Sequence, residues 1–356
     1  MTPLPPPATT AAADVPAPAT AAVPPPAADG WHGVRPLGVR GPLPPEVEAH
    51  QRRSLHDAFV LLEAYGIQRD ALLRCTNDGV SQARAHAEKS SHPAISMKAT
   101  CSRELCGGGF DVGLQMVFPS PWSSRCAMSY ANVPLPMYQM CAVIVESDLV
   151  PWPRWKRLPQ IEMPVLHRFA ANDLLLNPRV APFAVFDGSD SVQDFKAYAL
   201  PQPGHMLVYI HSPPEGATSW RGVPLPPPGP RRKRNLVKGC VWLLRPSDAH
   251  GGARVDVDVF LSEELPVPAW LIPPALVRLT VPPLAAKIVA AWQSMTSDLA
   301  SADSAIGARM REDGLGFYAA LREWLGQWRA ADAADAADAA AAPGPSATPS
   351  QTEAMM

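Results

Sequence analysis

Hydrophobic and polar residues alternate cleanly between Arg254 and Leu261. The odd positions carry Val or Leu, and the even positions up to 258 carry charge. This period of two predicts a strand with one buried face. Pro268 and a long, largely apolar helical stretch as far as Trp292 follow directly. We therefore expect that helix to cover the apolar face of a sheet, an arrangement more typical of ligand binding than of catalysis.

The remaining patterns predict two further helices and several strands. Leu55, Phe59 and Leu62 lie at helical spacing in a helix that begins near Pro45 and ends at Gly66, a natural C-terminal cap. A second helix is predicted over 134–149. Strands are predicted over 95–99, 112–118, 161–169, 193–200, 204–211, 237–245 and 253–261. Meandering strands with one helix inserted and one closing predict an α+β fold with an antiparallel sheet.

Two pairs of prolines fall within the closing helical stretch. Pro273 and Pro274 come at its start, whereas Pro282 and Pro283 lie in its middle. Proline is tolerated in a first helical turn but lacks the N–H that an interior position donates. The sequence therefore predicts two or three short helical segments in place of one rod.

Composition sets the domain layout. Proline accounts for 43 of 356 residues, more than twice its usual share of ~5%. The expected organisation is a disordered Pro/Ala-rich stretch (1–44), a helical segment (45–92), one ligand-binding domain (93–298), an amphipathic helix (299–330) and a low-complexity tail (331–356).

Charge and cysteine usage narrow the function classes. A formal net charge of −2 gives no reason to expect a nucleic-acid partner, and six scattered cysteines favour free thiols in a reducing compartment. No secretory signal, transit peptide or span of ~20 apolar residues is recognised. We expect a soluble, cytoplasmic protein, with peripheral membrane contact as an option.

No constellation of catalytic or metal-binding residues emerges. Cys101 and Cys106 lack the second ligand pair that zinc needs, and the Gly107–Gly109 run lacks the Lys-Ser/Thr of a phosphate loop. His205 and His211 would lie ~20 Å apart along one strand, so they are expected at the surface. No catalytic residue, cofactor or metal is therefore predicted.

Three sparse motifs, in order, resemble the START-like lipid-transfer domains of the helix-grip fold. They are Glu146-Ser-Asp148-Leu149 followed by Trp152 and Trp155, Pro182–Asp187 with Phe186 where the family has Arg, and Pro268–Ile272 before the lid helix. The resemblance spans about Ala94 to Met295. It implies a curved antiparallel sheet around a long C-terminal helix that closes a hydrophobic cavity. It also implies non-catalytic binding, and transfer between membranes, of a phospholipid or sterol.

Period-two alternation and the resemblance together select the candidate cavity residues. They are Met116, Met163, Val165, Phe195, Ala197, Val208, Ile210, Trp242, Val257 and Val259 on the sheet, and Leu276, Leu279, Leu284, Ile288 and Trp292 on the helix. Each of them fits an ordinary core equally well. Arg168, Glu146 or Asp148 could orient a lipid headgroup, the plainer alternative being surface salt bridges.

Two further features suggest surface contacts. Trp220 and the run Arg231, Arg232, Lys233 and Arg234 could touch an anionic membrane, although a nuclear-import signal or a solvated loop fits the run too. Phe317, Leu321, Trp324 and Trp328 stripe the last helix. Packing on the domain is expected, with membrane or partner binding as the alternative.

Two other function classes remain open. The first is a protein- or membrane-interaction module with a filled core that acts through the Trp-striped helix and the Pro-rich ends; protein partners are unknown. The second is a cavity enzyme of the same superfamily, which would need a polar cluster inside the chamber.

Overall fold

A computed structural model describes residues 31, 33–74, 94–101, 109–151, 161–182, 187–202, 204–247, 253–265, 268–297, 304–313 and 315–326. Trp152, Trp155, Phe183 to Phe186, Cys106 and Trp328 lie outside these residues, as do the segments 1–30 and 327–356.

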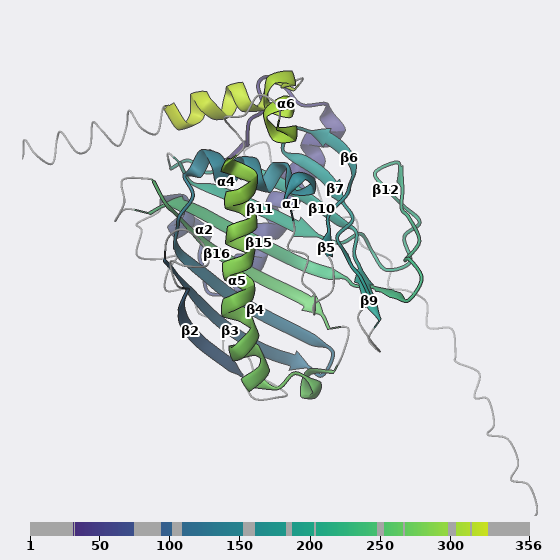
Figure 1. The fold of residues 1–356 in the computed structure, drawn as a ribbon. Coiled ribbons are helices and arrows are strands. Elements are labelled where there is room, and N and C mark those ends of the chain that lie inside the picture. The colour runs from purple at the N-terminus through teal and green to yellow at the C-terminus, as the bar shows by residue number, and fades with distance from the viewer. Residues whose placement is uncertain are drawn as a thin grey trace, which may run out of the picture.

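A ten-stranded sheet forms the centre of the molecule, and its neighbouring strands pair antiparallel (Figure 1). From one edge to the other its strands are β2 (Ile95–Cys101), β3 (Phe110–Ser120), β4 (Ser123–Val133), β16 (Val255–Glu264), β15 (Val237–Pro246), β11 (Met206–His211), β10 (Gln193–Ala199), β7 (Asp173–Leu176) and β6 (Val165–Ala170), and β1 (Arg35–Pro36) pairs with β10. A four-stranded sheet comprises β14 (Arg232–Arg234), β9 (Gly188–Asp190), β8 (Arg179–Val180) and β5 (Ile161–Glu162), and β12 (Ser219–Trp220) forms a hairpin with β13 (Val223–Pro224).

Helices cover both faces of the large sheet. They are α1 (Pro45–Ala64), α2 (Arg69–Arg74), α4 (Met137–Val145), α5 (Pro274–Ser297) and α6 (Ala305–Glu312), with short 3-10 helices η1 (Ser147–Leu149) and η3 (Ala269–Leu271); residues 317–326 are helical too. Figure 1 shows α5 in front of the curved sheet and α1 behind it. The predicted α+β fold, a curved antiparallel sheet around a long C-terminal helix, is confirmed.

The alternation along β10 shows how one strand serves both layers. Phe195 and Ala197 belong to the core beneath α5, whereas Tyr198 belongs to the core beneath α1. Lys196 points to the same side as Tyr198, because successive side chains of a strand face opposite ways. The α5 side of the sheet is therefore apolar, and the α1 side also carries buried charge.

Several details differ from the sequence prediction, and the short strands β1, β8, β9, β12, β13 and β14 are among them. β4 and β7 were not predicted, because β4 is rich in small and polar residues and β7 has only four residues. The closing segment is also one continuous helix, α5, with Pro282 and Pro283 inside it. Pro283 is exposed, so water can satisfy the carbonyl groups that lose their N–H partners.

Candidate ligand cavity

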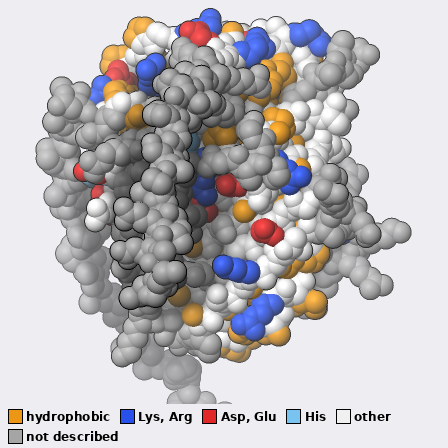
Figure 2. All heavy atoms as spheres, turned by 90° about the vertical axis from the view of Figure 1, so that its left-hand side faces the viewer, with side chains coloured by type: hydrophobic (Ala, Val, Ile, Leu, Met, Phe, Trp, Pro, Cys, Tyr) orange, Lys and Arg blue, Asp and Glu red, His pale blue; other side chains and the backbone are white. Residues whose placement is uncertain are grey.

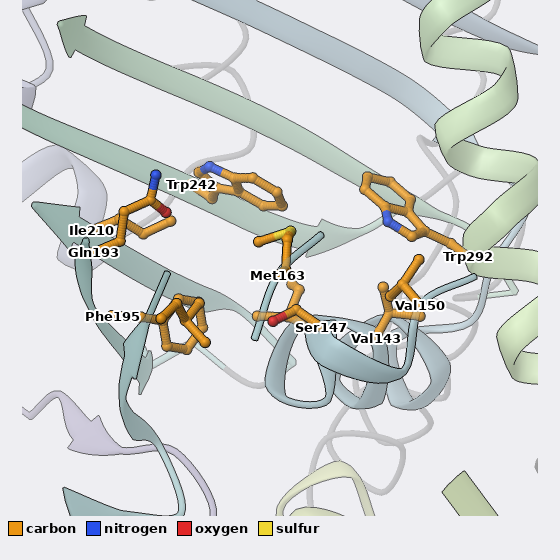
Figure 3. Close-up of a pocket in the computed structure, with 11 residues that line it drawn as sticks. Val143, Ser147, Val150, Met163, Gln193, Phe195, Ile210, Trp242 and Trp292 are labelled. Carbon is orange, nitrogen blue, oxygen red and sulfur yellow. The ribbon is translucent and has the colours of Figure 1, made fainter. Parts of the chain in front are cut away.

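An apolar cavity of about 100 Å³ lies between the α5 side of the sheet and the helices (Figure 3). It is lined by Val143, Ile144, Ser147, Val150, Met163, Leu176, Gln193, Phe195, Ile210, Trp242 and Trp292.

Strand alternation and the two helices bring these side chains together. Phe195 of β10, Ile210 of β11 and Trp242 of β15 come from the same face of neighbouring strands. Figure 3 shows Met163 between Trp242 and Trp292, whose ring centroids are 6.5 Å apart. The walls therefore offer aromatic and thioether surface that suits a hydrophobic ligand.

The cavity is small for its expected contents. Pockets that hold drug-sized ligands usually measure ~300–1,000 Å³, several times the volume found here. A lipid would therefore fit only if α4 or α5 moved away from the sheet.

The structure places the predicted cavity residues in four groups. Met163, Phe195, Ile210, Trp242 and Trp292 line the cavity. Ala197, Val208, Val257 and Val259 are buried in the surrounding core, with Val165 and Ile288 packed against it and Leu284 half-buried. Met116 packs against a separate small cluster, and Leu276 and Leu279 are 53% and 74% exposed. The expectation that Leu276 and Leu279 point inwards is wrong, because the first half of α5 turns these positions to solvent and packs Val277 on the sheet.

Most of the cavity wall missed by the sequence analysis comes from α4 and η1. Val143, Ile144, Ser147 and Val150 all lie on or beside these helices. The helix itself was predicted, and its almost wholly apolar sequence was a sign that both of its sides are covered.

Beside the cavity, Glu146 is the centre of an ionic cluster. Its carboxylate accepts a 2.6 Å hydrogen bond from Arg168 and another of 2.6 Å from Arg309. Arg309 also binds Asp148, and the Tyr318 hydroxyl donates to Glu146 across 3.0 Å. Burial and the neighbouring Glu146 carboxylate raise the pKa of Tyr318, so the hydroxyl stays protonated and donates. The carboxylates of Glu146 and Asp148 thus balance the guanidinium groups of Arg168 and Arg309, and headgroup recognition by Arg168, Glu146 or Asp148 stays a prediction.

A second polar cluster lies on the opposite, α1 side of the sheet. Asp194 is fully buried, and its carboxylate contacts Lys196 at 2.6 Å, His50 at 2.7 Å and the Trp220 indole N–H at 2.7 Å. Arg221 forms a bidentate pair with Asp173 at 2.6 and 2.9 Å, and also reaches Asp194 at 3.3 Å.

His211 lies at the edge of this cluster, not at the surface as predicted. Its side chain is 17% exposed, its Nε2 is 3.9 Å from Asp194, and its ring stacks on Tyr209. The β12–β13 hairpin covers the His211 ring with Trp220. The hairpin closes in a tight two-residue turn, in which Arg221 and Gly222 both have positive φ.

The predicted membrane-contact residues are only partly exposed to solvent. Trp220 is half-buried against His50 and His211. In the basic run, Arg231 and Lys233 are exposed, whereas Arg232 and Arg234 are half-buried and Arg234 pairs with Asp190. The expected stripe of the last helix packs on the domain, with Phe317 and Leu321 buried and Trp324 packed against the core.

The described residues include four buried cysteines and one long apolar helix. Cys101, Cys126, Cys141 and Cys240 are buried thiols outside any disulfide, and burial raises the pKa of Cys141 to about 12. Within these residues no group of three or more His, Cys, Asp or Glu could hold a metal ion. By length and composition alone, α5 could cross a membrane, a property that core helices of soluble proteins share.

No family model matches this sequence, and no curated protein matches it. Among solved structures, similarity is found to the lipid transfer and protein localization domain of human StarD13 (DLC2), with 15% identity over 56% of this chain and 89% of that chain and a TM-score of 0.36. Human STARD10 has 13% identity over 53% of this chain and 71% of that chain, with a TM-score of 0.39. A fragment (25–204) of a STAR-related lipid transfer protein from Xanthomonas axonopodis has 16% identity over 57% of this chain and 98% of that chain, with a TM-score of 0.37. The names of these three structures belong to the START family, which is the family that the sequence motifs resemble.

Proposed function

We propose that this protein binds a hydrophobic ligand, such as a phospholipid or sterol, in the cavity beneath α5, without catalysing a reaction on it. The cavity itself carries this proposal: its walls are almost entirely apolar, and it is bounded by a sheet face and two helices. Burial supplies ~0.8 kcal/mol per methylene, which gives ample affinity without covalent chemistry.

Entry requires a path from the surface to the cavity, and α5 offers a place where the structure can open. Its second half is held by Ala286, Val289 and Trp292 in the core, whereas its first half is largely exposed. Pro282 and Pro283, between the halves, remove two helical hydrogen bonds. The first half can therefore swing away from β2 while the second stays docked.

The ligand would be exchanged at a membrane that contacts the open end of α5. Trp122, Trp270, Leu271, Leu276 and Leu279 are all more than half exposed, and we call them the apolar patch. The β3–β4 turn and η3 adjoin, since the Ala269 N–H donates to the Pro121 carbonyl. In Figure 1 both lie at the lower end of the molecule, and Figure 2 shows hydrophobic side chains beside Lys and Arg towards that end. Exposed Arg278, and the lack of Asp or Glu from Pro268 to Ser297, suit anionic headgroups.

Filling the cavity tests ligand binding. Native mass spectrometry of the purified protein should find a co-purifying or added lipid, and organic extraction should identify it. Val143→Phe places a ring in the cavity, so we expect lipid occupancy to fall at least about tenfold. Val60→Phe, at an exposed position of α1, is the control and should bind normally.

A wild-type protein that is empty and takes up no lipid from mixed vesicles would overturn the proposal. The small volume of the cavity would then favour the second candidate, an interaction module whose apolar patch binds a protein partner.

Removing the two tryptophans tests the membrane contact. Each exposed indole that enters a membrane contributes a few kcal/mol, so the double variant Trp122→Ala/Trp270→Ala should lower vesicle binding by at least about tenfold. Co-sedimentation with phosphatidylcholine vesicles, with and without phosphatidylserine, measures this. Val60→Ala is the control for loss of an exposed hydrophobic residue. If Arg231→Ala/Lys233→Ala abolishes binding and the tryptophan variant does not, the contact lies at the basic run instead.

A further inference from the structure

One helical unit, α4 with η1, separates the cavity from the C-terminal part of the chain. Val143, Ile144 and Ser147 of this unit line the cavity. Tyr138 and Glu146 of the same unit contact residues 304–326. The unit is therefore the cavity wall on one side and a docking surface on the other.

The polar contacts between residues 304–326 and the domain concentrate on this unit. The Arg309 guanidinium spans two acidic side chains, with one nitrogen 2.6 Å from Glu146 and the other 2.7 Å from Asp148. Tyr318 donates to Glu146, and Arg322 donates to the Tyr138 hydroxyl across 3.3 Å. Away from the unit, Arg40 pairs with Glu323, and both side chains are more than half exposed.

Apolar contacts extend the same attachment. Ile306, Phe317, Leu321 and Leu325 are buried and belong to the core that contains the cavity walls. The ring of Phe317 lies against Gly38, whose positive φ and missing side chain allow the close approach.

On its inner side α4 packs buried apolar side chains on the core, and Arg168 of β6 donates to the Val145 carbonyl and to Glu146. The backbone hydrogen bonds of a helix are internal, so side chains alone hold it to its neighbours. Pro134 and Pro136 precede α4 and Pro151 follows η1, so regular structure stops at both ends. The unit is thus bounded by two breaks and covered on its outer side by residues 304–313 and 315–326.

We infer that residues 304–313 and 315–326 form a latch that holds α4 and η1 closed over the cavity, and that release of this latch opens a path for the ligand. This inference rests on the proposed function. Arg309 is the natural release point, since its side chain is 36% exposed and within reach of solvent ions, whereas Glu146 is almost fully buried.

Reversing the charge of Arg309 tests the latch. In Arg309→Glu a third carboxylate faces Glu146 and Asp148, so the latch is repelled. We expect NBD-labelled stearate to leave the full-length protein at least about tenfold faster in a stopped-flow chase. Amide exchange should also rise over 137–149 and 305–312. Glu312→Arg, at an exposed position of the same helix, is the matched control and should match wild type in both measurements.

A milder variant guards against loss of the fold. Tyr318→Phe removes only the hydroxyl that binds Glu146, and should speed dissociation about two- to fivefold with an unchanged near-ultraviolet spectrum. If exchange shows that the latch is released while the dissociation rate stays at the wild-type value, the latch inference is overturned and ligand binding stands. If no variant, wild type included, takes up the stearate probe, both the latch and the proposed function are overturned.

Discussion

Asp194→Ala is expected to lower the free energy of unfolding by about 3–5 kcal/mol, the loss typical of a buried charge left without its partner. The Lys196 side chain is fully buried, and its ammonium lies 2.6 Å from the Asp194 carboxylate. Burial alone would raise the pKa of Asp194, but Lys196 and the His50 hydrogen bond hold it well below its usual range. In the variant, Lys196 faces Arg221 with one carboxylate fewer between them.

Urea unfolding at neutral pH measures this loss, and two comparisons isolate its cause. Asp187→Ala removes a carboxylate from the pair with Arg231, in which both side chains are about half exposed, so it should cost below about 1 kcal/mol. The double variant Asp194→Leu/Lys196→Met replaces both charges by apolar groups and should recover much of the loss. If Asp194→Ala lowers the free energy of unfolding as little as Asp187→Ala does, Lys196 must find another partner or lose its proton at little cost in free energy.

The sheet and its two faces could be predicted from sequence because alternation is a local property. Val257 and Val259 were assigned to the core side of their strand, and both are buried in the core under α5. β4 escaped prediction because most of its residues between Ser123 and Val133 are small or polar, and its burial comes from neighbouring strands.

The sites depend on contacts between distant segments, which local patterns do not contain. Glu146 meets Arg309 across 163 positions of sequence. His211 is covered by Trp220 and Arg221 from a Pro-rich loop, whose composition alone indicates exposure. Leu276 and Leu279 were placed inside because α5 is apolar on most of its surface, so its pattern does not say which side meets the sheet.

From the buried cluster around Asp194 we expect the free energy of unfolding to fall as the solution becomes acidic. Burial, together with Lys196, lowers the pKa of His211 from 6.5 to about 4, and burial lowers that of His50 despite its bond to Asp194. Tyr209, Trp220 and Arg221 also surround His211. None of the three carries a negative charge that would raise the pKa of His211 again.

The sign follows from proton counts in the two states. Below pH ~6.5 the unfolded chain protonates these histidines, whereas the folded protein leaves His211 neutral until about pH 4. The unfolded state therefore binds more protons in this window, and stability is lost as the pH falls through it. For His211 alone the shift corresponds to about 3 kcal/mol at ~1.4 kcal/mol per pKa unit. Asp57, Asp258 and Glu263 oppose this trend, because burial raises their pKa values and the folded state then binds protons more readily.

A single histidine substitution separates these contributions. His211→Phe keeps a ring against Tyr209 and Trp220 but cannot be protonated, so its free energy of unfolding should fall by about 3 kcal/mol less than wild type between pH 7 and pH 4. Urea titrations at several pH values measure both slopes, and His167→Phe, at an exposed strand position, controls for the loss of a histidine. Parallel curves for His211→Phe and wild type would mean that His211 titrates in the folded protein as it does in the unfolded chain. The hairpin would then have to open in solution, because the closed hairpin keeps the ring in low-dielectric surroundings beside two cations.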